Sequence, residues 1–266
     1  MRNNRASKVI IAISIVVIML PVAVTLLWSF TARWSWPNIL PESLTTRTIQ
    51  ELLFGSSDLT QILCSSIFLA AIVAVLGTVI ALMTARATEI YHVRGSQVVS
   101  WLALLPLLVP GTVFAMGIQV SLIKLGLNDS IAGVVIVHLV AALPYCILIM
   151  IDVTRALGVE LEESAAVLGA SPERAFFNVA LPQLLPGILS SASMAFIISY
   201  SQYFTTLIAG GGRIKTLALV LVPYIQSGDR ALSSIYAAVF VGSALVVFFL
   251  LESIIHRVMR GSNNAE

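Results

Sequence analysis

Long apolar stretches, separated by short polar segments, run through almost the whole chain. Six of these stretches contain no Asp, Glu, Lys or Arg, namely residues 9–32, 59–85, 95–123, 130–151, 187–212 and 231–251. Each is long enough to cross the hydrocarbon layer of a membrane as a helix, which takes about 20 residues. A helix is required because lipid offers no hydrogen-bond partner to the backbone. The pattern therefore predicts an all-α membrane protein with six transmembrane helices.

Composition supports this class and excludes others. Hydrophobic residues make up 58% of the 266 residues and charged residues 11%, whereas a soluble domain carries about 25% charged residues. The net charge of +2 is too small to indicate nucleic-acid binding. The first apolar stretch follows Arg2, Arg5 and Lys8, as in a signal peptide. It is longer than a typical signal core, and no small-residue cleavage site follows it, so we predict a retained helix.

The distribution of Lys and Arg indicates the orientation in the membrane. Six crossings place both termini on one side, where nine Lys and Arg residues fall, against six on the other side. Because cytoplasmic loops carry the excess of positive charge, we expect both termini to be cytoplasmic. The polar loop of residues 152–186 then lies in the cytoplasm, and residues 33–58 and 213–230 face outward.

Residues for chemistry are scarce. The chain has no nucleotide-binding Gly-Lys-Ser/Thr loop, and no acid pair, His/Cys cluster or Ser-His-Asp set falls in one plausible site. We therefore expect no catalytic residue, no metal site and no cofactor bound by this chain. His138 lies deep in the fourth stretch, where a hydrogen bond between helices is more typical than a proton relay. A carrier driven by protons or sodium is poorly supported, so another source of energy is needed.

The loop of residues 152–186 predicts a pair of short helices. Residues 159–168 favour helix, with acids near the start that suit the helix dipole. Gly169 stands where a left-handed residue would end that helix. Ser171 and Pro172 suit the cap and first position of a second helix. Pro182 and Pro186 are expected to mark the segment that leads into the next span. From periodicity alone, a hairpin that only packs on its own membrane helices is an equal alternative.

At these residues the sequence resembles the inner-membrane permeases of binding-protein-dependent ABC importers. Their cytoplasmic signature has the form E-A-A, three residues, G, nine residues, I-x-L-P. Here it reads Glu163-Ser164-Ala165, then Gly169, then Val179-Ala180-Leu181-Pro182, with the same spacing and with Ser and Val as mild departures. The Pro-rich segments 105–111 and 142–145 are similar to the broken third helix and the fourth helix of the family. The resemblance covers about residues 59–255.

The resemblance implies a fold and a mechanism. The fold is the type I ABC importer permease fold, in the bacterial inner membrane. The loop is a coupling helix that docks on a cytoplasmic ATPase subunit, which binds ATP and Mg²⁺ itself. Other partners are a second permease, identical or related, and a periplasmic or lipid-anchored substrate-binding protein. The residues with which this chain would couple to the ATPase are Glu163, Ser164, Ala165, Gly169, Ser171, Phe176, Phe177, Leu181 and Pro182.

The fifth apolar stretch carries the candidates for a translocation path. They are the hydroxyl- and amide-bearing residues Ser199, Tyr200, Gln202, Tyr203 and Thr206. Helix-to-helix hydrogen bonding is an equal alternative for such residues. Within the family, residues 201–203, 210–213, 216 and 227–230 are similar to the branch of iron(III), thiamine, polyamine and aminophosphonate importers, and most of all to thiamine-type permeases. Polyamine permeases often carry acids where Ser201 and Gln202 stand here, and their absence disfavours a polycation.

The predicted organisation has three parts. Residues 1–58 form the first transmembrane helix and an outer loop, residues 59–255 form the permease core with the coupling loop at 152–186, and residues 256–266 form a cytoplasmic tail. The function expected is that of a transport subunit, not an enzyme. The alternative is a secondary transporter or channel without an ATPase partner.

Overall fold

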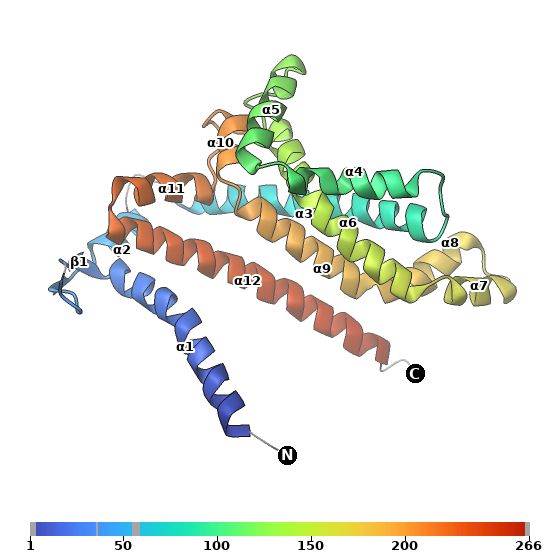
Figure 1. Cartoon of the computed structure of the whole chain (residues 1–266), viewed down its shortest axis with the longest axis horizontal. Helices are drawn as coiled ribbons and strands as arrows, with labels where there is room; N and C mark the ends of the chain where they lie inside the picture. The colour runs from blue at the N-terminus through green and yellow to red at the C-terminus, as the bar shows by residue number, and fades with distance from the viewer. Residues whose placement is uncertain (1–3, 36, 55–58, 264–266) are drawn as a thin grey trace. The chain divides into compact units, whose positions relative to one another are not determined.

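The computed structural model describes residues 4–35, 37–54 and 59–263, and it is helical almost throughout (Figure 1). Its α-helices are α1 (Asn4–Ser29), α2 (Arg47–Phe54), α3 (Leu59–Glu89), α4 (Ser96–Leu108), α5 (Gly111–Lys124), α6 (Ile131–Leu157), α7 (Glu160–Val167), α8 (Pro172–Ala175), α9 (Leu181–Tyr200), α10 (Phe204–Gly210), α11 (Leu217–Ser227) and α12 (Arg230–Asn263). A π-helical turn, η1 (Phe176–Ala180), and two short strands, β1 (Thr31–Arg33) and β2 (Ser43–Leu44), complete the set.

Five helices of the described chain are long and apolar enough to cross a membrane. They are Lys8–Ser29, Leu59–Glu89, Ile131–Leu157, Pro172–Tyr200 and Arg230–Ile254. The remaining apolar stretch, 95–123, forms two shorter helices, α4 and α5. The break falls at Val109, which is extended, with φ −96° and ψ 128°. Pro110 explains this, because a proline ring pushes the preceding residue out of the helical region. Pro106 and Pro144, in contrast, lie inside helices that continue past them.

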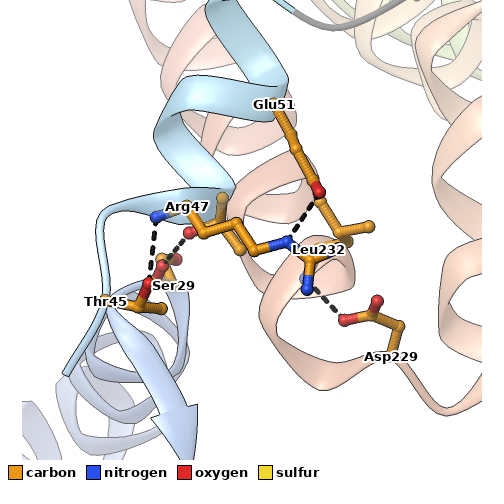
Figure 2. Close-up of polar contacts among 7 residues, drawn as sticks. Ser29, Thr45, Arg47, Glu51, Asp229 and Leu232 are labelled. Atoms are coloured by element: carbon orange, nitrogen blue, oxygen red, sulfur yellow. Dashed lines mark hydrogen bonds and ion pairs between the residues drawn. The ribbon is translucent and has the colours of Figure 1, made fainter. Parts of the chain in front are cut away.

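The chain divides into two compact units. The first contains the residues up to Ile62 and Val220–Ser243. Here β1 and β2 pair antiparallel, with Thr31 opposite Leu44. The hydroxyl of Thr48 donates to the carbonyl of Ser29, and Arg47 forms an ion pair with Glu51 at 2.8 Å. Figure 2 shows the Arg47–Glu51 ion pair.

Capping also fixes the start of α12 within the first unit. The Asp229 carboxylate accepts from the backbone N–H of Leu232 at 3.0 Å, as Figure 2 shows. This satisfies one of the N–H groups that every helix start leaves unpaired. Aromatic contacts also occur in this unit. Trp28 stacks on Trp34 with ring centroids 4.7 Å apart, and the Arg230 guanidinium lies 5.1 Å from the centre of the Trp28 ring.

The second unit contains Leu63–Leu219 and the chain from Ala244 onward. Its centre is the pair α6 and α9, which pack along much of their length. Gly187 of α9 makes this approach possible, because a Cβ there would lie only 2.7 Å from the Val153 side chain of α6. On α3, Ala70, Val73, Ala81 and Ala85 are fully buried. Small residues at such positions let helix backbones come close, which is how helices associate in lipid.

Candidate functional site

The first arm of the polar loop is the short helix α7, and its end is closed by local hydrogen bonds. Gly169 has φ +89°. Its N–H donates to the carbonyl of Ala166, and the N–H of Ala170 donates to that of Ala165. These two bonds form the Schellman motif, which requires a left-handed residue at the position of Gly169. The predicted helix over 159–168 and its glycine stop are both confirmed.

The second arm begins at Ser171, and the helical chain then runs to the end of α9. The Ser171 hydroxyl accepts from the backbone N–H of Arg174 at 3.4 Å, and Pro172 occupies the first helical turn, as the sequence predicts. The helix widens at η1, where the N–H of Leu181 donates to the carbonyl of Phe176. Pro182 lies in the first turn of α9, at the approach to the span as predicted, and Pro186 lies inside α9. The wider turn admits Pro182, which lacks an N–H, and the helix continues.

We call residues 160–180 the hairpin; it protrudes at the end of α6 and α9 (Figure 1). Most of the predicted coupling residues in the hairpin lie on its surface: Glu163, Ser164, Gly169, Ser171 and Phe177 are exposed, while Ala165 and Phe176 are half-buried. The other two begin α9, where Leu181 is half-buried and Pro182 is exposed. Two apolar residues at the tip of the hairpin are more exposed than any of the predicted apolar contacts. Val167 is 88% exposed and Leu168 is 89% exposed. An apolar tip of this kind offers a contact surface to another protein.

The base of the hairpin is held by a largely buried ion pair. Arg86, in the last turn of α3, donates from Nη1 and Nη2 to the two carboxylate oxygens of Glu162, at 2.7 and 2.9 Å. The side chains are only 10% and 17% exposed. The Arg86 guanidinium also lies 4.6 Å from the ring centre of Phe176 and 5.8 Å from that of Tyr91. One side chain of α3 therefore contacts both arms of the hairpin.

A glycine at the junction of α6 and α7 sets the direction of the hairpin. Gly158 has φ +69°, and a Cβ there would lie 2.1 Å from a carboxylate oxygen of Glu160. Its N–H donates to the carbonyl of Thr154, which closes α6. Any other residue would be strained in this conformation and would also displace Glu160. The sharp turn between the membrane helix and the hairpin therefore depends on glycine.

The predicted path residues surround a break between α9 and α10. Ser199 and Thr206 are buried, and each hydroxyl lies 2.9 Å from a different ring nitrogen of His138 on α6. The prediction that His138 forms hydrogen bonds between helices is confirmed. Tyr200 is buried and stacks on Phe196, with centroids 5.5 Å apart.

The other two predicted path residues are half-buried at the break itself. They are Gln202 and Tyr203. The Gln202 side-chain carbonyl accepts from the Thr205 hydroxyl at 2.6 Å, and its backbone carbonyl accepts from the Thr206 hydroxyl at 2.7 Å. These bonds satisfy backbone and side-chain groups that the helix end leaves unpaired, which is needed inside a membrane.

Sequence reasoning missed several residues of the site: Arg86, Gly158, Glu162, Val167 and Leu168. Arg86 entered only the count of positive charges, because its partner lies 76 residues away. A usable signal existed, since an Arg that follows an apolar stretch in the last turn of a long helix needs a partner if it is buried. Val167 and Leu168 gave no such signal, because an apolar residue next to a glycine stop can face the core or water.

Comparison with known proteins identifies the family. The Streptomyces antibioticus protein ORF1, provisionally named an ABC transporter permease, is 34% identical over 132 residues, which cover 48% of this chain and 58% of that protein. Haemophilus influenzae PotC, a spermidine/putrescine transport system permease protein, is 24% identical over 204 residues, 77% of this chain and 79% of its own.

A third relative matches almost end to end. Salmonella typhi PhnV, provisionally named a 2-aminoethylphosphonate transport system permease protein, is 25% identical over 266 residues, 96% of this chain and 97% of its own. The polyamine and aminophosphonate relatives confirm the branch that the sequence resembles. Residues 77–261 match the binding-protein-dependent transport system inner membrane components. This chain belongs to that family, and it is a multi-pass protein of the bacterial inner membrane.

Proposed function

We propose that this chain is the membrane-spanning subunit of an ATP-driven importer and that the hairpin couples it to a cytoplasmic ATPase. The observation that carries the proposal is the construction of the hairpin. Its tip exposes Val167, Leu168 and the carboxylate of Glu163, while its base is fixed to α3 by Arg86 and Glu162. A stiff element with a free apolar tip and an anchored base can receive a movement at one end and deliver it at the other.

The topology that goes with this function has six spans. The pair α4 and α5 would form the third crossing, interrupted at Val109 and Pro110, and the other five crossings are the long apolar helices. Both termini and the hairpin would be cytoplasmic, as the excess of Lys and Arg on that side favours. In this arrangement the hairpin faces the compartment that contains ATP.

The partners follow from the same mechanism. They are two ATPase subunits that bind ATP and Mg²⁺, a second permease and a substrate-binding protein on the outer side. This chain would supply the path, contribute no catalytic residue and bind no cofactor. Gln202 and Tyr203 would face the path at the α9–α10 break, with Ser199, Tyr200 and Thr206 as the wall behind them. The lack of an acid at Ser201 and Gln202 favours a substrate other than a polycation.

Copurification tests the proposal. The tagged chain, expressed with its neighbouring genes, should bring down an ATPase subunit and show ATP hydrolysis that vanadate inhibits. Replacing Leu168 with Arg should abolish recovery of the ATPase, because it places a charge at the apolar tip. Replacing Leu125, which is 70% exposed outside the hairpin, with Arg is the matched control. Normal recovery of the ATPase with L168R would remove the coupling assignment, and a chain that transports alone would support a secondary transporter.

A further inference from the structure

The last turn of α3 carries two opposite charges, and each pairs with a different part of the loop region. Arg86 pairs with Glu162 of α7, and Glu89 pairs with Arg155 in the last turn of α6. We propose that Arg86 is a positioning residue that locks the hairpin to α3, so that α3 moves with the hairpin. This inference rests on the proposed function, since it names the membrane helix that receives the movement.

The Arg86–Glu162 pair has the geometry of a rigid connection. Its two parallel N–H···O bonds, of 2.7 and 2.9 Å, fix the orientation of the guanidinium as well as its distance. Both helix dipoles favour the pair, because a cation is stabilised at the end of α3 and an anion at the start of α7. The pair is largely hidden from water, so it is weakly screened by salt.

The aromatic contact adds a second point of attachment. Phe176 begins the π-helical turn, and its ring centre lies 4.6 Å from the Arg86 guanidinium. A guanidinium can use its edge for a carboxylate and its face for a ring, whereas an ammonium cannot. Arg86 therefore connects α3 to both arms of the hairpin. Rotation of either arm alone would break one of these contacts.

The neighbouring pair, Arg155 with Glu89, is also bidentate, because Nη2 of Arg155 donates to Oε1 of Glu89 at 3.2 Å, but it is open to water. Its Nε–Oε2 distance is 2.9 Å, but the Arg155 side chain is 65% exposed. Exposed pairs contribute little because water and salt screen them. Arg155 also lies on α6, which already continues into the hairpin through the backbone. The two pairs are one turn apart on α3 and use the same residue types, so Arg155 is a matched control for Arg86.

Movement of the end of α3 would reach the centre of the second unit. At Gly77, midway along α3, a Cβ would lie 3.6 Å from Leu139, 3.7 Å from Cys146 and 3.8 Å from Ala195, which belong to α6 and α9. The helix has 31 residues, about 46 Å at 1.5 Å per residue. A continuous helix of this length, which lies close to α6 and α9 near its middle, transmits a displacement of its end.

The first experiment measures the lock directly. Spin labels replace Met83 on α3 and Glu173 on the hairpin, both exposed, in a background with Cys64 and Cys146 changed to Ser. We expect one narrow distance distribution with Arg86, and a distribution about twofold wider in R86Q as the hairpin opens locally. R155Q should keep the narrow distribution. R86K should resemble R86Q, because it retains the charge but loses the fork and the flat face.

The second experiment measures coupling in the complex copurified with its ATPase, using ATP and Mg²⁺ as the probe. If the hairpin is released from α3, the ATPase no longer has to move this helix along with α6 and α9, so basal hydrolysis should rise about tenfold in R86Q and stay unchanged in R155Q. The double variant R86Q/E162Q leaves no uncompensated buried charge, so it tests the same release without a folding defect.

The outcomes separate this inference from the proposed function. A narrow distance distribution in R86Q and in R86Q/E162Q overturns the lock. A wide distribution with unchanged or lower hydrolysis overturns its role in coupling. If the unaltered chain copurifies no ATPase, the proposed function fails instead, and the distance measurement on the chain alone still decides whether Arg86 holds the hairpin.

Discussion

The hairpin and the break between α9 and α10 are both polar segments of an apolar chain, but they are constructed in opposite ways. The turn and caps of the hairpin are made by residues three to five positions apart, such as Ala170 with Ala165 and Ser171 with Arg174. At the break Gln202 also has local partners, but the buried hydroxyls of Ser199 and Thr206 meet His138, which lies 61 and 68 residues away from them. The first segment is specified locally, and the second exists only once the helices have packed.

The base of the hairpin also depends on contacts between residues that are distant in the sequence. Replacing Glu162 should therefore cause the largest loss of stability. Replacing it with Ala leaves the Arg86 guanidinium buried without its partner. Loss of one member of a buried pair typically costs about 3–5 kcal/mol, and we expect about 3 kcal/mol because both groups lie at helix ends. Thermal unfolding in detergent, monitored by proteolysis of the loop, measures this loss of stability.

Glu163 is the control for Glu162, because it is the next residue on the same helix and is exposed. Its replacement by Ala should change stability by less than about 0.5 kcal/mol. It should nevertheless reduce ATP-dependent transport while leaving membrane insertion intact, as a residue that faces the ATPase would. Equal loss of stability in the two variants would contradict the distinction between base and tip.

His138 tests the long-range network at the α9–α10 break. Its replacement by Leu would leave the buried hydroxyl of Ser199 without its imidazole partner and remove one contact of Thr206. Hydrogen bonds between membrane helices are worth about 1–2 kcal/mol at most, so we expect a loss of that size in thermal unfolding. S201A is the control, because Ser201 is exposed and its hydroxyl donates only to its own turn. An unchanged melting temperature for H138L would show that the network is dispensable.

Gly169 tests the local side of the comparison. A Cβ at this position would contact nothing within 4 Å, so any effect of Gly169→Val comes from backbone strain alone. The left-handed conformation costs an L-residue about 1–2 kcal/mol, and we expect faster cleavage at residues 168–171 and reduced transport. Asn tolerates this conformation, so G169N should remain close to the unaltered chain. Equal defects in both variants would point to a lost contact with another protein rather than to strain.

Ser171 should show the smallest effect of the series. Its hydroxyl caps the second arm through a bond of 3.4 Å, which is long for a hydrogen bond. Loss of a helix cap costs about 0.5–2 kcal/mol, and the long bond places S171A at the lower end. S171D should restore the cap and suits the helix dipole, so proteolysis should be slower than in S171A. No difference between the two variants would mean that the cap does not hold the second arm.

Much of the fold was predictable because its signals are local. The apolar stretches, the break at Pro110, the glycine stop at Gly169 and the cap at Ser171 all follow from neighbouring residues. The continuity of the helix through Pro182 was not predictable, because the π-helical turn that admits this proline has no simple sequence signal. The exposure of Val167 and Leu168 could not be predicted from the sequence either, since an apolar residue next to a turn can face the core or water.

The sequence by itself determined that this protein crosses the membrane many times, that one polar loop forms a helical hairpin and that it resembles the importer permeases. These properties depend on the length of the hydrophobic stretches, on helix caps and on motif spacing, which are encoded by residues close together in the sequence. Only the tertiary structure decided that Arg86 meets Glu162 and Phe176 and that His138 joins Ser199 to Thr206. The physical reason is that a buried charge or imidazole is satisfied by any suitable partner, and only packing of distant helices selects which one it contacts.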